Sequence, residues 1–145
     1  MAYPPLVRYG TVAEYRAHYL RLYCRGPITT FDGIAVRFRK SRFDHCFYES
    51  TRRNQIKDDF SLQRAERIDW IRAALQDSNA ELHIGWDGKK KRYDRSHRVA
   101  LVAGDYVVII RLSGSRIAQF VTAYVADSPS TLAKIKGSPK WDPPK

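Results

Sequence analysis

The sequence predicts one α+β domain, and three observations lead to this class. Two segments have apolar residues at helical spacing, an alternating strand lies between them, and strand patterns follow one another from residue 80 onward. This order is typical of N-terminal helices packed on a mainly antiparallel β-meander sheet. The 145 residues fit a single domain, which we expect to cover 1–145 with an irregular start over 1–10 and a tail over 138–145.

The first helix is predicted over 12–23. Thr11 and Glu14 have the spacing of a capping box, which closes the first turn of a helix. Gly26 and Pro27 end the helix. Its apolar side chains recur at helical spacing and are predicted to be core residues: Val12, Tyr15, Tyr19, Leu22 and Tyr23.

Two further segments precede the meander. A half-buried strand is predicted over 33–39. The spacing of apolar residues does not decide whether 43–50 is a helix or a strand. A second helix is predicted to begin after the N-cap Ser61 and to stop near Asn79. The strand turns Ile34, Val36 and Phe38 inward, and the buried stripe of the helix comprises Leu62, Ala65, Ile68, Ile71 and Leu75.

The rest of the chain is rich in strands. Strands are predicted over 80–86, 98–103, 106–112 and 117–126, followed by a short helical turn over 130–136. Gly104 and Asp105 form a turn signal between two of these strands. The run 106–112 is apolar on both faces, which indicates a central strand.

The last strand carries the first candidate functional residues. Regular alternation predicts that Thr122 and Tyr124 stand side by side, next to the ring of Phe120, opposite a mostly apolar core face. Hydroxyl groups can donate to phosphate oxygens, and a ring can stack on a base. Ordinary strand residues on a solvated face explain the same pattern equally well.

The charge of the chain points to a polyanionic partner. Lysine and arginine number 26 against 15 acidic residues, a net charge of +11, and cations that neutralise phosphates release counterions. Arg64 and Arg67 are predicted to project together from the second helix, either as a phosphate-binding pair or as ion-paired surface residues. A basic connection is predicted to attract a nucleic-acid backbone, with Lys89, Lys90, Lys91, Arg92 and His97 as its contacts.

His45 is the strongest acid–base candidate, because the pKa of imidazole lies nearest to neutral pH. His45 and Glu49 are four residues apart and are predicted to share a face in either a helix or a strand. Glu49 would then orient the imidazole or act as a base itself. The alternative is a histidine packed between Phe43 and Phe47.

Several classes of site have no signature in the sequence. We find no metal-ligand spacing, Gly-rich phosphate loop or nucleophile elbow, so neither a metal nor a cofactor is expected. No apolar run reaches the roughly 18 residues of a membrane span, so no membrane partner is expected. Two cysteines and the lack of a secretory signal indicate a cytoplasmic protein.

An N-terminal helical half with a His-bearing segment precedes the meander, and Phe120–Tyr124 in a late strand leads into Lys134–Lys136 and Pro139–Trp141. This layout resembles the barnase/EndoU/colicin/RelE-like superfamily of small ribonucleases, the BECR fold. Phage-linked and toxin members are nearest in style, and the resemblance covers 40–137. It implies a BECR-like fold and metal-free RNA cleavage on the open face of a sheet. On this sequence it implies catalytic roles for His45, Arg98, Arg111, Thr122 and Tyr124, with Glu49 as a substitute for a glutamate base.

The expected function is therefore a metal-independent, toxin-like endoribonuclease, in which a 2′-hydroxyl attacks the adjacent phosphorus to give a 2′,3′-cyclic phosphate. Expected partners are RNA, such as tRNA or mRNA, and an acidic immunity or antitoxin protein. The main alternative is a non-catalytic nucleic-acid-binding module that uses the same basic surface. A metal-dependent DNA nuclease and a protein-interaction domain also remain open.

Overall fold

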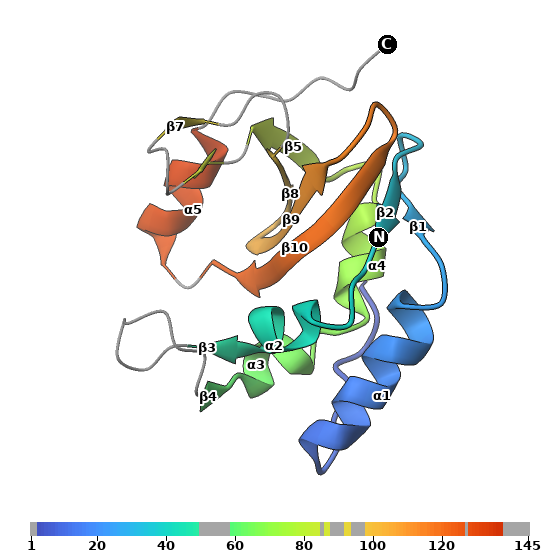
Figure 1. Ribbon diagram of the computed structural model, residues 1–145. Coiled ribbons are helices and arrows are strands. Elements are labelled where there is room, and N and C mark those ends of the chain that lie inside the picture. The colour runs from blue at the N-terminus through green and yellow to red at the C-terminus, as the bar shows by residue number, and fades with distance from the viewer. Residues whose placement is uncertain are drawn as a thin grey trace.

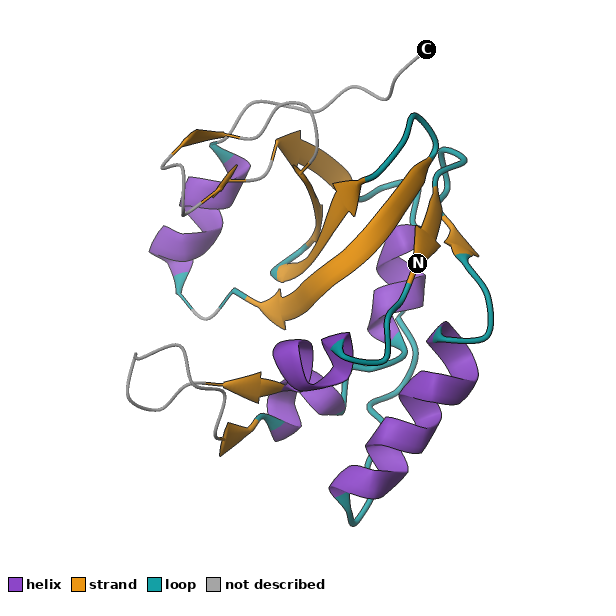
Figure 2. Cartoon of the chain, in the orientation of Figure 1, coloured by secondary structure: helices purple, strands orange, loops and turns teal. Residues whose placement is uncertain are grey.

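Helices pack on both faces of a six-stranded sheet (Figure 1). The structure is a computed structural model that describes residues 3–49, 59–84, 86–87, 92–93, 98–126 and 128–137. One face, which we name the first face, packs on four helices: α1 (Val12–Tyr23), α2 (Arg42–Phe47), α3 (Leu62–Ala65) and α4 (Trp70–Leu75). The opposite, second face packs on α5 (Pro129–Lys136). Figure 2 shows this layering, which confirms the predicted α+β class.

The sheet has the strand order β1-β2-β10-β9-β8-β5, and only β2 and β10 run parallel. The predicted meander is present, because β8, β9 and β10 are consecutive antiparallel neighbours. β9 is central, as predicted, and all its residues except Arg111 are buried. The six strands are β1 (Ile28–Thr29), β2 (Ala35–Arg37), β5 (Glu81–Ile84), β8 (Arg98–Ala103), β9 (Tyr106–Leu112) and β10 (Ile117–Val125).

Two short hairpin-like pairs lie outside the main sheet. β3 (Tyr48–Glu49) pairs with β4 (Asp59–Phe60), directly after α2. β6 (Trp86–Asp87) pairs with β7 (Arg92–Tyr93). The segment that period alone did not assign is therefore a short helix followed at once by a strand.

The first helix has the predicted bounds because its N-cap and its buried apolar residues indicate the same segment. The backbone N–H of Glu14 donates to the Thr11 hydroxyl at 3.3 Å, as the capping pair predicts. Tyr15, Tyr19 and Tyr23 are at most 1% exposed, so one tyrosine face is fully in the core. The predicted aromatic stripe is confirmed as packing.

The predicted second helix is broken into α3 and α4. Ser61 caps α3 as predicted, but the turn between the helices lets the Tyr23 hydroxyl enter the helical hydrogen-bond ladder. That hydroxyl donates to the carbonyl of Ile68 and accepts from the backbone N–H of Arg72 at 3.1 Å, replacing the bond these two groups would make with each other. Leu62 is 53% exposed, so its predicted place in the buried stripe is wrong.

The core of the first face is aromatic. Phe120 is 1% exposed and stacks on Phe38 with ring centroids 4.8 Å apart. The predicted base-stacking role of Phe120 is therefore wrong, because its ring is sealed between the sheet and the helices. Phe43 and Phe47 of α2 lie in the same core.

A β-bulge explains why regular alternation fails in β10. The register to β9 shifts between Phe120 and Thr122, so Val121 is the extra residue. Before the bulge Ala118 and Phe120 face the first core, and after it Ala123 does. The bulge moves Thr122 and Tyr124 to the face opposite Phe120.

The second face has a smaller core. Ala100 and Val102 of β8 pack there with Val107 and Ile109 of β9, partly covered by Ile135 of α5. The Lys136 ammonium of α5 lies 3.6 Å from the Glu81 carboxylate of β5.

The N-terminal segment has no helix or strand over 3–10, as predicted, yet it is anchored on the helices. The indole N–H of Trp70 donates to the Pro4 carbonyl at 2.7 Å, and the Val7 N–H donates to the Glu66 carbonyl at 2.8 Å. Within the described ranges, every helix is too short or too polar to cross a membrane. The predicted tail over 138–145 lies outside the described residues.

Candidate functional site

Thr122 and Tyr124 share the second face of the sheet, as predicted. Their Cα partners on β9 are Ile109 and Val107, two residues of the second core. Both side chains are half-buried. Beside them stand aliphatic side chains rather than the predicted ring of Phe120.

Three predicted site residues meet at the edge of this face. The Arg64 Nε of α3 lies 3.3 Å from the Glu49 Oε1 of β3. The guanidinium carbon of Arg64 lies 5.7 Å from the centre of the Tyr124 ring on β10, within cation–π range. We name Glu49, Arg64 and Tyr124 the acid–base centre. Its members come from three elements that are separate in the sequence.

Arg64 is held in place on both sides. Its Nη1 donates to the Cys46 carbonyl at the end of α2, at 3.0 Å. The Cys46 thiol in turn donates to the Ala123 carbonyl of β10 at 3.6 Å, which ties α2 to the strand. Within the described part of the chain Arg64 Nη2 has no bond, so it keeps a donor for an anion. The arginine side chain is 20% exposed and that of Glu49 is 45% exposed.

Electrostatics favours a protonated Tyr124. Burial raises the pKa of its phenol above the ordinary value of 10.0, and the Arg64 charge opposes this only in part. Tyr124 therefore keeps its proton at neutral pH and can donate a hydrogen bond. The Glu49 carboxylate beside the guanidinium can accept hydrogen bonds.

His45 lies on the exposed side of α2, while Phe43 and Phe47 are buried on the other side. The alternative of a histidine packed between these rings is thus wrong. The periodicity argument for a common face with Glu49 does not apply, because α2 ends at Phe47 and the period changes before Glu49. The two residues belong instead to consecutive elements.

An arginine row crosses the second face at Gln119 of β10, five residues, or roughly 16 Å, along the strand from Tyr124. In the sheet register Arg37 of β2 lies beside Gln119 of β10, Gln119 lies opposite Arg111 of β9, and Arg111 lies opposite Arg98 of β8. On each strand a residue adjacent to the row member, such as Ala118 before Gln119, is buried in the first core. Because side chains alternate along a strand, the described side chains of the row point to the second face. Arg37 and Arg111 are exposed.

The predicted pairing of Arg64 with Arg67 is wrong, because α3 ends at Ala65 and the two side chains diverge. Arg67 donates to the Gln63 carbonyl at 2.7 Å, lies 3.2 Å from Glu66, and covers the Trp70 ring at 5.0 Å. It is therefore an ion-paired structural residue. The predicted phosphate-binding role of Arg67 has no support in this position.

The side chains of the predicted basic connection, residues 89–98, are not among those that the structure describes. Lys89, Lys90, Lys91 and His97 lie outside the described residues, and Arg92 and Arg98 are placed by their backbone alone. Among the described residues no three or more His, Cys, Asp or Glu side chains are grouped to hold a metal ion.

A hydrogen-bonded triad that the sequence did not indicate lies on the helical side. His18 of α1 bonds the Tyr9 hydroxyl through Nδ1 at 2.8 Å and Asp69 through Nε2 at 2.7 Å. His18 adjoins a pocket of about 530 Å³ between α1 and α4, with Arg21 and Arg72 among its lining residues. No short-range pattern links Tyr9, His18 and Asp69, so only the fold brings them together.

No protein-family model, curated protein or solved structure matches this chain. The resemblance to the small ribonuclease superfamily therefore stays a prediction.

Proposed function

We propose that the protein is a metal-independent endoribonuclease whose acid–base centre is Glu49, Arg64 and Tyr124. The observation that carries this proposal is the meeting of a carboxylate, a guanidinium and a protonated phenol on one edge of the sheet. Attack of a 2′-hydroxyl on phosphorus needs these three types of group: a proton acceptor, a cation and a hydrogen-bond donor.

The proposed reaction begins when the Glu49 carboxylate takes the proton of a 2′-hydroxyl. The 2′-oxygen attacks the adjacent phosphorus, and the bond from phosphorus to the 5′-oxygen breaks in line with it. His45 supplies a proton to the leaving oxygen. The products are a 2′,3′-cyclic phosphate and a free 5′-hydroxyl, with atoms and charge in balance.

Two cationic groups act on the phosphate in this proposal. Arg64 uses its remaining donor on the non-bridging oxygens as charge develops, assisted by the hydroxyls of Thr122 and Tyr124. The arginine row binds neighbouring phosphates of the strand, for which a bidentate guanidinium is well suited. RNA such as tRNA or mRNA is the proposed substrate, and an acidic immunity or antitoxin protein is a proposed partner.

Purified protein incubated with total RNA in EDTA tests the proposal. Cleavage products that end in 2′,3′-cyclic phosphate support it. Intact RNA with retarded mobility refutes the enzyme and supports the second candidate, a non-catalytic nucleic-acid-binding module. The arginine row favours that candidate specifically, because binding requires the cations and not Glu49.

Replacing the proposed acid gives the first prediction. We expect His45→Ala to lower kcat by about a hundredfold, because general acid catalysis contributes about 10²–10⁴-fold. His45 is exposed, so the variant should remain folded and lose less than about 1 kcal/mol of stability. Rates measured on a short RNA, together with thermal melting, give both numbers, and a variant that keeps most activity would remove His45 from the mechanism.

A second histidine provides the matched control. We expect His18→Ala to destabilise the fold by about 1–3 kcal/mol, because the variant leaves the half-buried Asp69 and the Tyr9 hydroxyl without their partner. The cleavage rate of the folded protein should be unchanged. Denaturant unfolding and rate measurements on the same samples separate the two histidines, and a large loss of rate in His18→Ala would contradict the assignment.

A further inference from the structure

Four cations stand in the six consecutive residues from the last residue of β2 to the first residue of α2. We name residues 37–42 the basic segment, and its cations are Arg37, Arg39, Lys40 and Arg42. Three of these side chains are exposed and that of Arg42 is half-buried. Over the described ranges none of the four forms an ion pair, and the nearby Asp44 is already bound to Arg16 at 2.7 Å. Their charge is therefore uncompensated within the described protein.

The core fixes the backbone of the basic segment. Phe38 is 7% exposed and stacks on Phe120, which directs the residues before and after it outward. The buried Tyr19 donates its hydroxyl hydrogen to the carbonyl of Arg39 at 2.8 Å. These cations therefore project from a fixed support, and less conformational entropy is lost when they bind.

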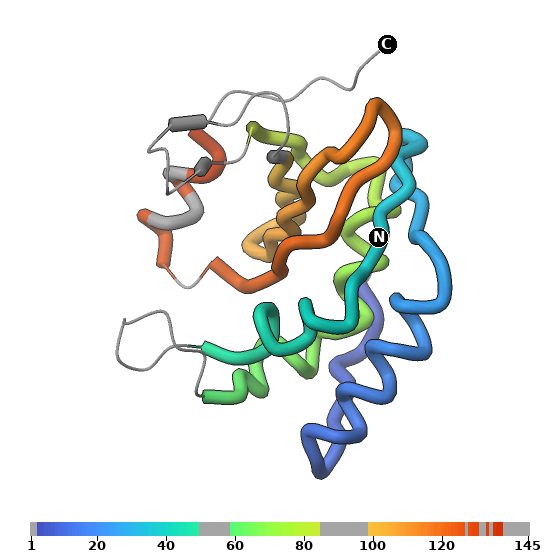
Figure 3. Tube along the Cα trace, in the orientation of Figure 1, coloured from blue at the N-terminus to red at the C-terminus, as the bar shows by residue number. Residues whose placement is uncertain are grey.

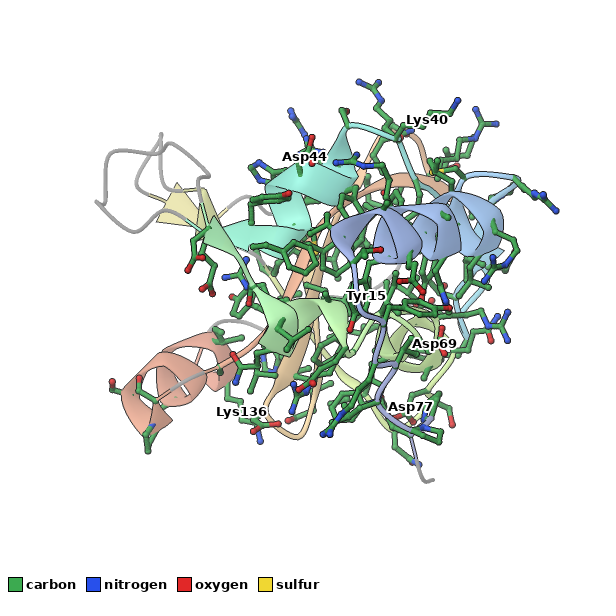
Figure 4. All side chains as sticks on the ribbon, turned by 90° about the horizontal axis from the view of Figure 1, so that it is seen from below. Tyr15, Lys40, Asp44, Asp69, Asp77 and Lys136 are labelled. Atoms are coloured by element: carbon green, nitrogen blue, oxygen red, sulfur yellow. The ribbon has the colours of Figure 1, made fainter. Side chains whose placement is uncertain are left out.

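The basic segment connects the arginine row to the acid–base centre. Its first residue, Arg37, is a member of the row. Its last residue, Arg42, begins α2, and the chain then follows the edge of β10 to Glu49, as the trace in Figure 3 shows. The five helical residues after Arg42 rise by about 7.5 Å and the two extended residues that follow add about 6.6 Å, so roughly 14 Å of chain separates the segment from Glu49. Lys40 and Asp44 mark this outer side of the molecule in Figure 4.

We infer that the basic segment binds the phosphates of a single-stranded RNA whose scissile linkage lies at the acid–base centre. This inference rests on the proposed function and deepens it by naming the substrate class. In-line attack requires the 2′-oxygen, the phosphorus and the 5′-oxygen to align, which regular stacking in a duplex prevents. An unstacked single strand reaches this geometry, and fixed cations beside the centre hold its backbone.

The test compares two charge-matched double variants. Arg39→Ala with Lys40→Ala removes two cations of the segment, and Arg21→Ala with Arg72→Ala removes two exposed arginines on the helical side. Binding is measured by fluorescence anisotropy against a 2′-O-methyl RNA strand, which has no attacking hydroxyl, over a range of salt concentrations. The segment variant should bind at least about tenfold more weakly, and its salt slope should fall by about 1.4, or 0.7 for each lost phosphate contact. The helical-side variant should keep the wild-type slope.

The outcomes distinguish the inference from the function on which it rests. Equal weakening in both double variants would reduce the effect to net charge and overturn the inference, as would equal affinity for a duplex. If the wild type binds through the segment but cleaves no RNA, the proposed activity fails while the binding site stands. On cleavable RNA the segment variant should raise KM and leave kcat within about twofold.

Discussion

Glu49→Gln should lower the rate of RNA cleavage by about a hundredfold to ten-thousandfold, the range typical of a lost general base. Glutamine has the size of glutamate and can still contact Arg64, but it cannot accept the proton of a 2′-hydroxyl. The side chain is 45% exposed, so stability should change by less than about 1 kcal/mol. Single-turnover cleavage of a short RNA measures the rate, and binding of the uncleavable 2′-O-methyl strand shows that the substrate site is intact.

Glu66→Gln is the matched control for this experiment. Glu66 also lies beside an arginine, with its carboxylate 3.2 Å from Arg67, but it lies away from Tyr124 in the turn between α3 and α4. This substitution should leave the cleavage rate within about twofold of wild type, since only the Glu49 pair is next to the proposed phosphate site. A comparable loss in both variants would mean that glutamate–arginine pairs act through stability rather than through proton transfer.

The parts of the fold that could be predicted from sequence are those where local signals agree. In α1 the cap, the apolar spacing and the Gly26 stop all indicate the same helix, and β9 is apolar on both faces as a central strand must be. The split between α3 and α4 could not be predicted, because it depends on the Tyr23 hydroxyl, which arrives from a helix more than forty residues earlier along the chain.

The site was predictable in its residue types but not in its grouping. From the sequence, Glu49 and Tyr124 were recognised as catalytic candidates of one site, whereas Arg64 was recognised separately as a phosphate-binding candidate. Their meeting depends on the β3 segment that follows α2 at once, and on the bulge at Val121 that sets the face of Tyr124. Such tertiary causes leave no trace in local periodicity.

Phe120→Ala decides between the two roles that the sequence and the structure assign to this ring. Because the side chain is 1% exposed and stacked on Phe38, we expect a loss of about 3–5 kcal/mol in the free energy of unfolding. A base-stacking ring would show the opposite pattern, with little change in stability and weaker binding of RNA. Denaturant unfolding measures the first quantity, and anisotropy with the 2′-O-methyl strand under folding conditions measures the second.

Phe31→Ala provides the comparison, since Phe31 is 39% exposed and its removal should cost less than about 1 kcal/mol. The basic segment adds a second consequence for Phe120, because the stack on Phe38 is what turns Arg37 and Arg39 outward. Phe120→Leu, which keeps an apolar side chain against Phe38, should therefore restore most of the stability and the full salt dependence of RNA binding. If Phe120→Leu remains stable yet loses RNA affinity, the ring contacts RNA directly and the buried assignment is wrong.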